Sequence, residues 1–520
     1  MRPVRQRGVG VLFAVLMAAL LVTFAGVREA GAVPSFARKY QTSCLTCHTV
    51  FPVLNPFGEA FRRNGYRFPN QNGSTDSDAV KASMIALGQD EYKKSFPNSV
   101  WPSQIPDAIP LSVMFNGAVT MNIPGSDAQN NAGNTFTWAG LLGEFHLFGA
   151  GALSDTLTYF TQVTITQQGN QSIQGDIETA YLLWNDVVGP DHAVNFWIGR
   201  LFAPQLTSFG MHSDYMNDSR LPGVSVIGLY NNTAQSFWIG GNNQHSDGVE
   251  LNGILNHRFG WSLGWLASAN GAGVNQLNAE DAYAHIGIKS GGMALDGEGK
   301  YGTNVPDSTK PWAEKAITLD AFAYHGLNVF DNGTGTVAGG AATPVSQGDK
   351  FNAIGATIRA QYDSLVLDGG GTFEHHGRAY GGSPASANPS GNGNPIYGVP
   401  DYTGAHGIVG WGELNYVVWP WFVPGVRAEY TEGHAEGGPN FSLLRVIPGI
   451  AMLVRPDVRV VFNGDLETSY GAPVAGLLSS CSGASNCGWA AAGGSINPAT
   501  PGKQGAFQAE SITATAAVAF

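Results

Sequence analysis

The chain is poor in charged residues, in cysteine and in long apolar runs. Charged residues make up 13% of its 520 residues, against about 25% in ordinary globular domains. Its net charge is −12, which argues against nucleic acid as a partner because the phosphate backbone requires a basic surface. After the N-terminus no apolar run approaches the ~20 residues of a membrane-spanning helix. These absences disfavour a soluble enzyme of ordinary composition, a nucleic-acid-binding protein and a helical membrane protein.

The N-terminus predicts a secretory signal peptide over residues 1–32. Three arginines fall within the first seven residues, an apolar run follows over 9–25, and Ala30-Gly31-Ala32 offers a small-residue cleavage site. The run is about 17 residues, at the short limit for a spanning helix. We therefore expect export and a mature chain that starts at Val33.

Directly behind this signal lies Cys44-Leu45-Thr46-Cys47-His48. The C-x-x-C-H spacing is typical of covalent c-type haem attachment. It predicts that Cys44 and Cys47 form thioethers to one haem c and that His48 is the proximal iron ligand. A zinc site would need more ligands, and Cys481 and Cys487 are far away in the sequence. A thioredoxin-like redox pair would need a βαβ context, which the surrounding sequence does not show.

Residues 33–109 are predicted to form a small, mainly α-helical cytochrome domain that ends in a linker. Short helices are expected over 59–64 and 78–87, with Gly65 and Gly88 behind them. The stretch from Trp101 is rich in proline and reads as a linker. So short a domain buries little core, and a covalent haem would supply the missing apolar surface.

The distal haem ligand stays open at the level of sequence. Met84 is the only methionine within 33–109 and His48 the only histidine. A thioether would suit a haem of high potential. Met84 is therefore the first candidate and Met114 the second, while a histidine of the following domain and an open position remain alternatives.

Residues 110–520 are predicted to form an all-β outer-membrane barrel of about sixteen antiparallel strands. From Leu111 onward apolar and polar residues alternate in long runs, and charged side chains recur on one face, which therefore cannot meet lipid. The runs begin near residues 111, 135, 155, 173, 191, 245, 260, 279, 315, 348, 363, 403, 421, 439, 457 and 506.

Loop lengths along these runs alternate between short and long. Short turns belong on the periplasmic side of bacterial barrels and long loops outside. Long polar loops are expected near 204–244, 328–347, 378–402 and 471–505, whereas 291–314 is long where a short turn should be. Trp419 and Trp421 crowd one short turn, as interfacial aromatics do. The chain ends in Phe520, which resembles the assembly signal of such barrels.

Other side chains carry weaker expectations. Cys481 and Cys487 share the last long loop, and in an exported chain a small disulfide is the default. Two groups could meet a hard metal ion outside the cell, although solvated loop residues are the commoner explanation. They are Glu374-His375-His376 and the set His212, Asp214 and Asp218. Five charges are expected in the lumen, where they would suit either a polar plug or an open pore: Arg427, Glu429, Arg459, Asp465 and Glu467.

The N-terminal motifs resemble one known family. Pro34-Ser35-Phe36-Ala37-Arg38, the haem motif, Leu54-Asn55-Pro56-Phe57-Gly58 and Asn64-Gly65-Tyr66 are similar to those of the fused monohaem cytochrome–porins of iron-oxidising bacteria. The resemblance covers residues 33–68, and beyond them only the architecture carries it. It implies a Gram-negative outer membrane, uptake of electrons from extracellular Fe(II) and a periplasmic cytochrome or cupredoxin as acceptor.

Three functions follow as hypotheses. The first is an Fe(II)-oxidising electron conduit, an oxidoreductase whose cytochrome domain plugs the lumen. The second is a diffusion porin with a tethered cytochrome. The third is export of electrons to an extracellular acceptor, because the direction of flow depends on potentials that the sequence does not reveal.

Overall fold

The computed structural model describes the barrel strands and part of the N-terminal segment. The described residues are 36, 44–50, 53–66, 111–122, 135–153, 156–168, 172–189, 192–202, 245–267, 281–297, 310, 312–336, 342–376, 405–435, 440–455, 458–471 and 508–519. The expected signal peptide, the second expected helix and most of the long loops lie outside them.

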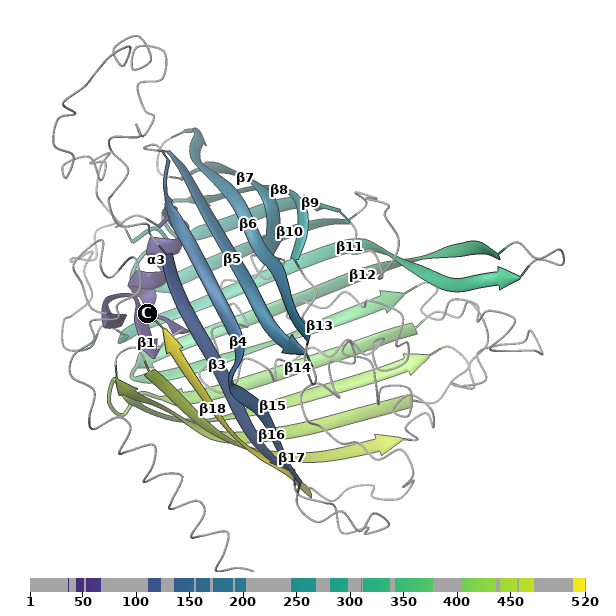
Figure 1. The fold of residues 1–520 in the computed structure, drawn as a ribbon. Helices are drawn as coiled ribbons and strands as arrows, with labels where there is room; N and C mark the ends of the chain where they lie inside the picture. The colour runs from purple at the N-terminus through teal and green to yellow at the C-terminus, as the bar shows by residue number, and fades with distance from the viewer. Residues whose placement is uncertain are drawn as a thin grey trace, which may run out of the picture.

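In the part of the chain that the structure describes, sixteen antiparallel strands close into one barrel, and Figure 1 shows how they are arranged. Neighbours in sequence pair throughout, and β18 closes the ring by pairing with β3. The strands are β3 (Leu111–Asn122), β4 (Thr135–Ala152), β5 (Leu157–Gln168), β6 (Ser172–Val188), β7 (Val194–Phe202), β8 (His245–Leu255), β9 (Phe259–Leu266), β10 (Asp281–Gly291), β11 (Glu314–Thr336), β12 (Ala342–Asp363), β13 (Leu365–His376), β14 (Ala405–Tyr416), β15 (Phe422–Ala435), β16 (Asn440–Arg455), β17 (Val458–Gly471) and β18 (Gln508–Ala519).

The alternation seen in the sequence sorts side chains between two faces. Along β10, buried and exposed residues alternate: Tyr283, His285 and Lys289 are buried, while Ile286 and Ile288 are each 52% exposed. Large apolar side chains are thus exposed on the outer face and polar ones are buried inside. A closed barrel satisfies its backbone groups and presents this apolar face, which are the requirements for crossing a bilayer with strands.

The expected strands are confirmed, with one correction. Observed strands begin within a few residues of the expected positions, except that β12 begins at Ala342 rather than near 348. The stretch 328–347, expected to be a long polar loop, is mostly strand, because β11 and β12 stay paired out to Thr336 and Ala342. This hairpin extends beyond the rest of the barrel in Figure 1. The sequence of this stretch is polar, because strands that extend beyond the membrane need no apolar face. Its lack of alternation is why the pairing was not expected.

Short connections gather at one end of the barrel, here called the short-turn end. Ser364 alone joins β12 to β13, and Trp419 and Trp421, each 51% exposed, stack at the β14–β15 turn with ring centroids 5.1 Å apart. The long connection between β10 and β11 lies at this same end, so the exception noted in the sequence is real. Its described residues Ala294, Leu295, Asp296 and Trp312 are buried.

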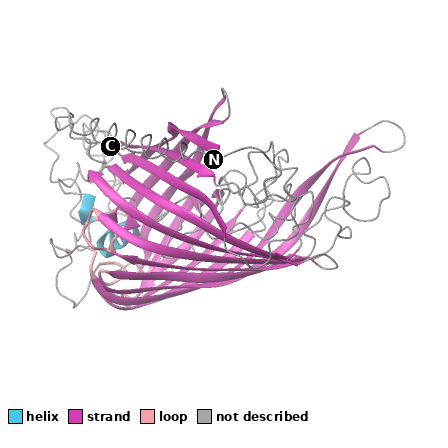
Figure 2. Ribbon diagram, turned by 90° about the horizontal axis from the view of Figure 1, so that it is seen from below, coloured by secondary structure: helices cyan, strands magenta, loops and turns pink. Residues whose placement is uncertain are grey.

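The N-terminal segment, defined as residues 44–50 and 53–66, lies at the short-turn end (Figures 1 and 2). It contains the 3₁₀ turn η1 (Cys44–Thr46), the strands β1 (His48–Val50) and β2 (Val53–Leu54), and the helix α3 (Pro56–Arg63). The two-stranded sheet was not expected. The helix begins three residues before the expected start, since Asn55 caps it and Pro56 suits its first turn. Among the described residues, no helix is both long and apolar enough to cross a membrane.

Candidate functional site

The C-x-x-C-H motif forms one tight turn that leads into β1. The backbone N–H of Cys47 donates to the carbonyl of Cys44 over 3.2 Å, which closes η1. Cys44 and Cys47 form no disulfide and are partly exposed, and His48 follows directly as the first residue of β1. The two sulfur atoms and the imidazole are therefore carried by one short stretch of backbone.

Asn55 ties this turn to the helix behind it. Its side-chain oxygen accepts a hydrogen bond from the Gly58 N–H at 2.9 Å, which caps α3. Its amide donates to the carbonyl of Thr46 at 3.0 Å, and its backbone N–H donates to the carbonyl of Cys47 at 2.9 Å. A single buried residue thus satisfies two carbonyls of the haem motif and one helix N–H, so motif and helix form one unit.

The Cys47 thiol lacks the lowered pKa that is typical of a redox-active C-x-x-C pair. Burial and the neighbouring Cys44 raise the pKa of the Cys47 thiol to about 12, whereas redox-active C-x-x-C pairs have a lowered thiol pKa. Two cysteines without a disulfide and the histidine that follows them are the residues that a c-type haem needs. Among the described residues no group of three or more His, Cys, Asp or Glu could hold a metal ion directly.

One side of the N-terminal segment packs into the barrel wall through apolar contacts. Val50 and Val53, at most 1% exposed, belong to a buried cluster with residues of the β10–β11 connection and of strands β13 to β17. The wall residues of this cluster are Trp312, Val366, Val417, Val423, Ala451 and Val461. Each lies near the short-turn end of its strand or connection, which places the haem motif at that end.

The opposite side of the segment reaches other parts of the ring. The turn after α3 contacts β5, β6 and the β10–β11 connection through Asn64, Gly65 and Tyr66. Together with the apolar cluster, these contacts touch three separate regions of the ring of strands. A segment held at three such regions lies across the lumen rather than along one side of it, which agrees with Figure 2.

Helix α3 turns a charged face toward the interior of the barrel. Arg62 and Arg63 reach the Glu59 carboxylate at 3.0 and 3.5 Å. Burial opposes the negative charge of Glu59, but these arginines and Arg359 of β12 outweigh it and hold the Glu59 pKa below its usual value. The helix therefore brings an ion network into the barrel in addition to its buried apolar residues Phe57, Ala60 and Phe61.

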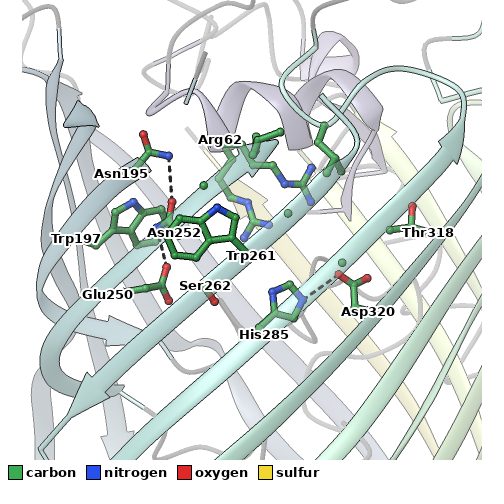
Figure 3. A pocket seen from close by; sticks show the side chains of 16 residues that line it. Arg62, Asn195, Trp197, Glu250, Asn252, Trp261, Ser262, His285, Thr318 and Asp320 are labelled. Carbon is green, nitrogen blue, oxygen red and sulfur yellow. Dashed lines mark hydrogen bonds and ion pairs between the residues drawn. The ribbon is translucent and has the colours of Figure 1, made fainter. Parts of the chain in front are cut away.

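A cavity separates this helix face from the wall of β7 to β11 (Figure 3). Arg62 and Arg63 line it from the helix, and His285, whose Nε2 lies 2.9 Å from an oxygen of Asp320, lines it from the wall. Glu250, which accepts a hydrogen bond from Tyr283, lies beside them. The cavity joins the N-terminal segment to the polar interior of the barrel.

Farther around the wall, inward charges pair with one another. Arg427, 1% exposed, donates to Glu413 at 2.9 Å and to Glu429 at 2.8 Å. Arg445 continues the row to Glu429 at 3.3 Å and to Asp465 at 3.0 Å. The expected inward placement of Arg427, Glu429, Arg459 and Asp465 is confirmed by their burial. The Glu467 side chain is not among those described.

Some of the other residues expected to act as ligands lie outside the described residues, and others have a position in the barrel. Met84, Cys481, Cys487 and His212 lie outside the described residues. Met114 lies in β3 opposite His146 of β4, a buried histidine whose Nδ1 is 2.8 Å from the Thr164 hydroxyl. His375 lies opposite His406 on the face that carries the exposed side chains of Phe373 and Ile408, so it faces outward and not into the lumen.

Sequence reasoning assigned no role to Asn55, Gly58 or Tyr66. Each had been quoted only as part of a family motif. Their contacts join segments that are distant in sequence or hold the haem turn to the helix, and a one-dimensional pattern does not display such contacts. The signal that could have found them is a helix-capping Asn-Pro pair directly behind a haem motif.

No family model matches the chain, and no curated protein matches it. Among solved structures, it is similar to an anion-selective porin from Comamonas acidovorans, at 11% identity and a TM-score of 0.44, over 79% of this chain and 99% of that one. It is also similar to OmpT of Vibrio cholerae, at 11% identity and a TM-score of 0.42, over 79% and 97% of the two chains. The outer membrane channel DcaP of Acinetobacter baumannii matches at 10% identity and a TM-score of 0.40, over 79% and 96%.

Proposed function

We propose that the protein carries electrons across the outer membrane, from extracellular Fe(II) to a periplasmic cytochrome or cupredoxin. The observation that supports this most is the position of the C-x-x-C-H motif across one mouth of a membrane-spanning barrel. Cys44 and Cys47 would hold one haem c covalently, and His48 would ligate its iron. A channel that only lets solutes diffuse would not need a redox centre in that position.

The chain's own residues position this centre. A c-type haem bound there supplies a one-electron redox group. Each Fe(II) ion gives up one electron and becomes Fe(III), and the periplasmic carrier accepts that electron. Asn55 holds the haem turn against α3, and Val50 and Val53 hold it against the wall. These contacts keep the attachment site at a constant depth in the barrel.

The position of the N-terminal segment in the barrel limits the route by which Fe(II) can reach the haem motif. Short turns face the periplasm in bacterial barrels, so the haem motif lies near the periplasmic carrier and far from the long loops. The hydrocarbon core is about 30 Å thick. Soluble Fe(II) must therefore enter the barrel from the long-loop end. Buried acids lie on the inner face, including Glu250, Asp281 and Asp320, and each of them contacts a neighbouring tyrosine or histidine.

Met84 is our proposed distal ligand, with Met114 as the second choice. Met114 lies in β3, the first barrel strand after the N-terminal segment. A Met-ligated ferric haem shows a weak near-infrared absorption band. That band should disappear in Met84→Ala and persist in Met114→Ala. The opposite pattern would transfer the role to Met114.

A diffusion porin with an attached cytochrome is the second candidate. The similar solved structures named above are porins and channels, which favours a barrel that conducts solutes. Electron export differs from the first proposal only in the direction of electron flow. That direction depends on whether the extracellular partner or the periplasmic carrier has the higher reduction potential. A channel function predicts sugar permeation, whereas both electron-transfer functions predict a redox-active haem.

Redox titration of the purified protein tests the first proposal. We expect one haem per chain, reducible by Fe(II), and loss of covalent haem staining in a Cys44→Ala, Cys47→Ala double variant. A haem that Fe(II) fails to reduce, or staining that survives the double substitution, would contradict the proposal.

A further inference from the structure

The three residues that follow α3, Asn64-Gly65-Tyr66, each contact a different element of the barrel. The resemblance drawn from the sequence quoted them without a role. The helix ends at Arg63, and backbone bonds from Asn64, Gly65 and Tyr66 to carbonyls of α3 hold the turn rigid. The turn is therefore preformed on the N-terminal segment and offers its side chains to the wall.

Asn64 binds the long β10–β11 connection. Its side-chain amide donates to the carbonyl of Asp296 at 2.8 Å, and Asn64 is only 5% exposed. Asp296 is itself held by His257, whose Nδ1 lies 2.6 Å from its carboxylate. The connection that is too long for a periplasmic turn thus supplies a fixed acceptor for the N-terminal segment.

Gly65 allows a close approach to β5 and β6. Its φ is +66°, a conformation that favours glycine. Its carbonyl accepts a hydrogen bond from the Thr158 hydroxyl at 3.1 Å. A Cβ atom at this position would lie 2.6 Å from the Asn185 amide nitrogen. Both the backbone shape and the space therefore require glycine.

Tyr66 completes the contact with β6. Its hydroxyl lies 2.8 Å from that of Tyr181, and its ring stacks on Phe160 with centroids 5.4 Å apart. Phe36 also stacks on the Tyr66 ring, with centroids 5.5 Å apart. Tyr66 is thus enclosed by rings from both the wall and the start of the chain.

We propose that Asn64, Gly65 and Tyr66 form a latch that fixes the haem-bearing segment across the periplasmic mouth of the barrel. The latch and the apolar cluster around Val50 and Val53 hold opposite sides of the segment. Both are needed to keep the haem motif at one position. Opening the latch leaves the haem attached but frees the segment to leave the wall. Only the consequence for electron transfer rests on the function proposed above.

Trypsin cleavage after Arg62 and Arg63 measures the latch directly in the full-length protein. These bonds belong to the folded end of α3 while the segment is held, so cleavage reports the fraction of molecules in which it has come free. Asn64→Asp replaces the donating amide with a carboxylate oxygen, which cannot donate to the Asp296 carbonyl. Tyr66→Phe removes the hydroxyl that bonds to the Tyr181 hydroxyl. A buried polar group without a partner favours opening, so we expect cleavage to accelerate roughly tenfold in each variant.

A double-mutant cycle separates the latch from general loosening. Tyr66→Phe and Tyr181→Phe remove the same bond, so the double variant should be cleaved no faster than either single one. Asn352→Asp and Tyr430→Phe, on exposed residues of the outer face, should leave cleavage unchanged. Unboiled gel mobility confirms that every barrel is folded.

Cleavage at the wild-type rate in the latch variants, or additive effects of the two tyrosine changes, would overturn the proposal. Covalent haem staining should stay at the wild-type level, while Fe(II)-driven reduction of a cytochrome enclosed in liposomes should fall at least severalfold. If the wild type transfers no electrons, the proposed function fails, and the cleavage rates still decide whether the latch exists.

Discussion

A Cβ atom on Gly58 would lie 2.1 Å from the carbonyl oxygen of Cys47. The first turn of α3 therefore rests on the last residue of the haem pair, with no room for a side chain between them. The same carbonyl accepts a hydrogen bond from the Asn55 N–H. The position of Cys47 is thus set by the helix that follows it.

Gly58→Ala should lower covalent haem content at least severalfold. The clash is with backbone, which cannot move aside without displacing Cys47. Haem staining per folded barrel, judged by gel mobility before boiling, measures the effect. Gly410→Ala is the matched control, because a Cβ there would have its nearest neighbour at 3.9 Å. Full haem content in Gly58→Ala would show that this approach is not required.

Two substitutions of Asn55 separate its roles as cap and as tether. Serine keeps a capping oxygen but is too short to reach the Thr46 carbonyl, whereas alanine loses both bonds. The serine change should destabilise the segment by about 1 kcal/mol, and the alanine change by about a further 1 kcal/mol for the lost cap. Denaturant titration followed by haem absorbance gives both values. Equal losses would mean that the cap contributes nothing.

The barrel was largely predictable from the sequence, because outward-facing apolar residues and inward-facing residues alternate along its strands. Ile286 and Ile288 alternate with His285 and Gly287 along β10, so the pattern itself separates lipid from lumen. The pattern failed at 328–347, where the paired strands outside the apolar belt carry no such alternation. The chemistry expected of Cys44, Cys47 and His48 also depends on local spacing, and it stays a prediction.

A cytochrome domain that plugs the lumen was expected, but the contacts that place the haem motif in the barrel could not be read from the sequence. Asn64 meets Asp296 across more than two hundred residues, and Tyr66 meets Tyr181 across more than one hundred. The one sequence feature that pointed there was the long β10–β11 connection, which broke the rule for short turns. That departure is explained by its contacts with Asn64 and with the cluster that contains Trp312.

Ile286→Arg tests whether the exposed face of β10 meets lipid. A charge on the lipid face near the bilayer midplane costs about 2–4 kcal/mol. Refolding into liposomes across a urea series should show a loss of this size, while Ile286→Leu should refold like the wild type. Unchanged refolding of the arginine variant would place this face in water.

Arg427→Met tests the row of ion pairs on the inner wall. Removing the guanidinium leaves Glu413 buried without its cation and Glu429 with Arg445 alone, which should cost about 3–5 kcal/mol. Adding Glu413→Gln and Glu429→Gln to the same variant should recover much of that loss. A single variant as stable as the wild type would mean that the row contributes little to the barrel.

The central claim is that the haem-bearing segment conducts electrons while it closes the barrel to solutes. The direct measurement uses liposomes that contain the protein and enclose an oxidised cytochrome. External Fe(II) should reduce the enclosed cytochrome, and small sugars should fail to swell the same vesicles. Rapid sugar entry without internal reduction would contradict the account and identify a diffusion porin that carries a cytochrome.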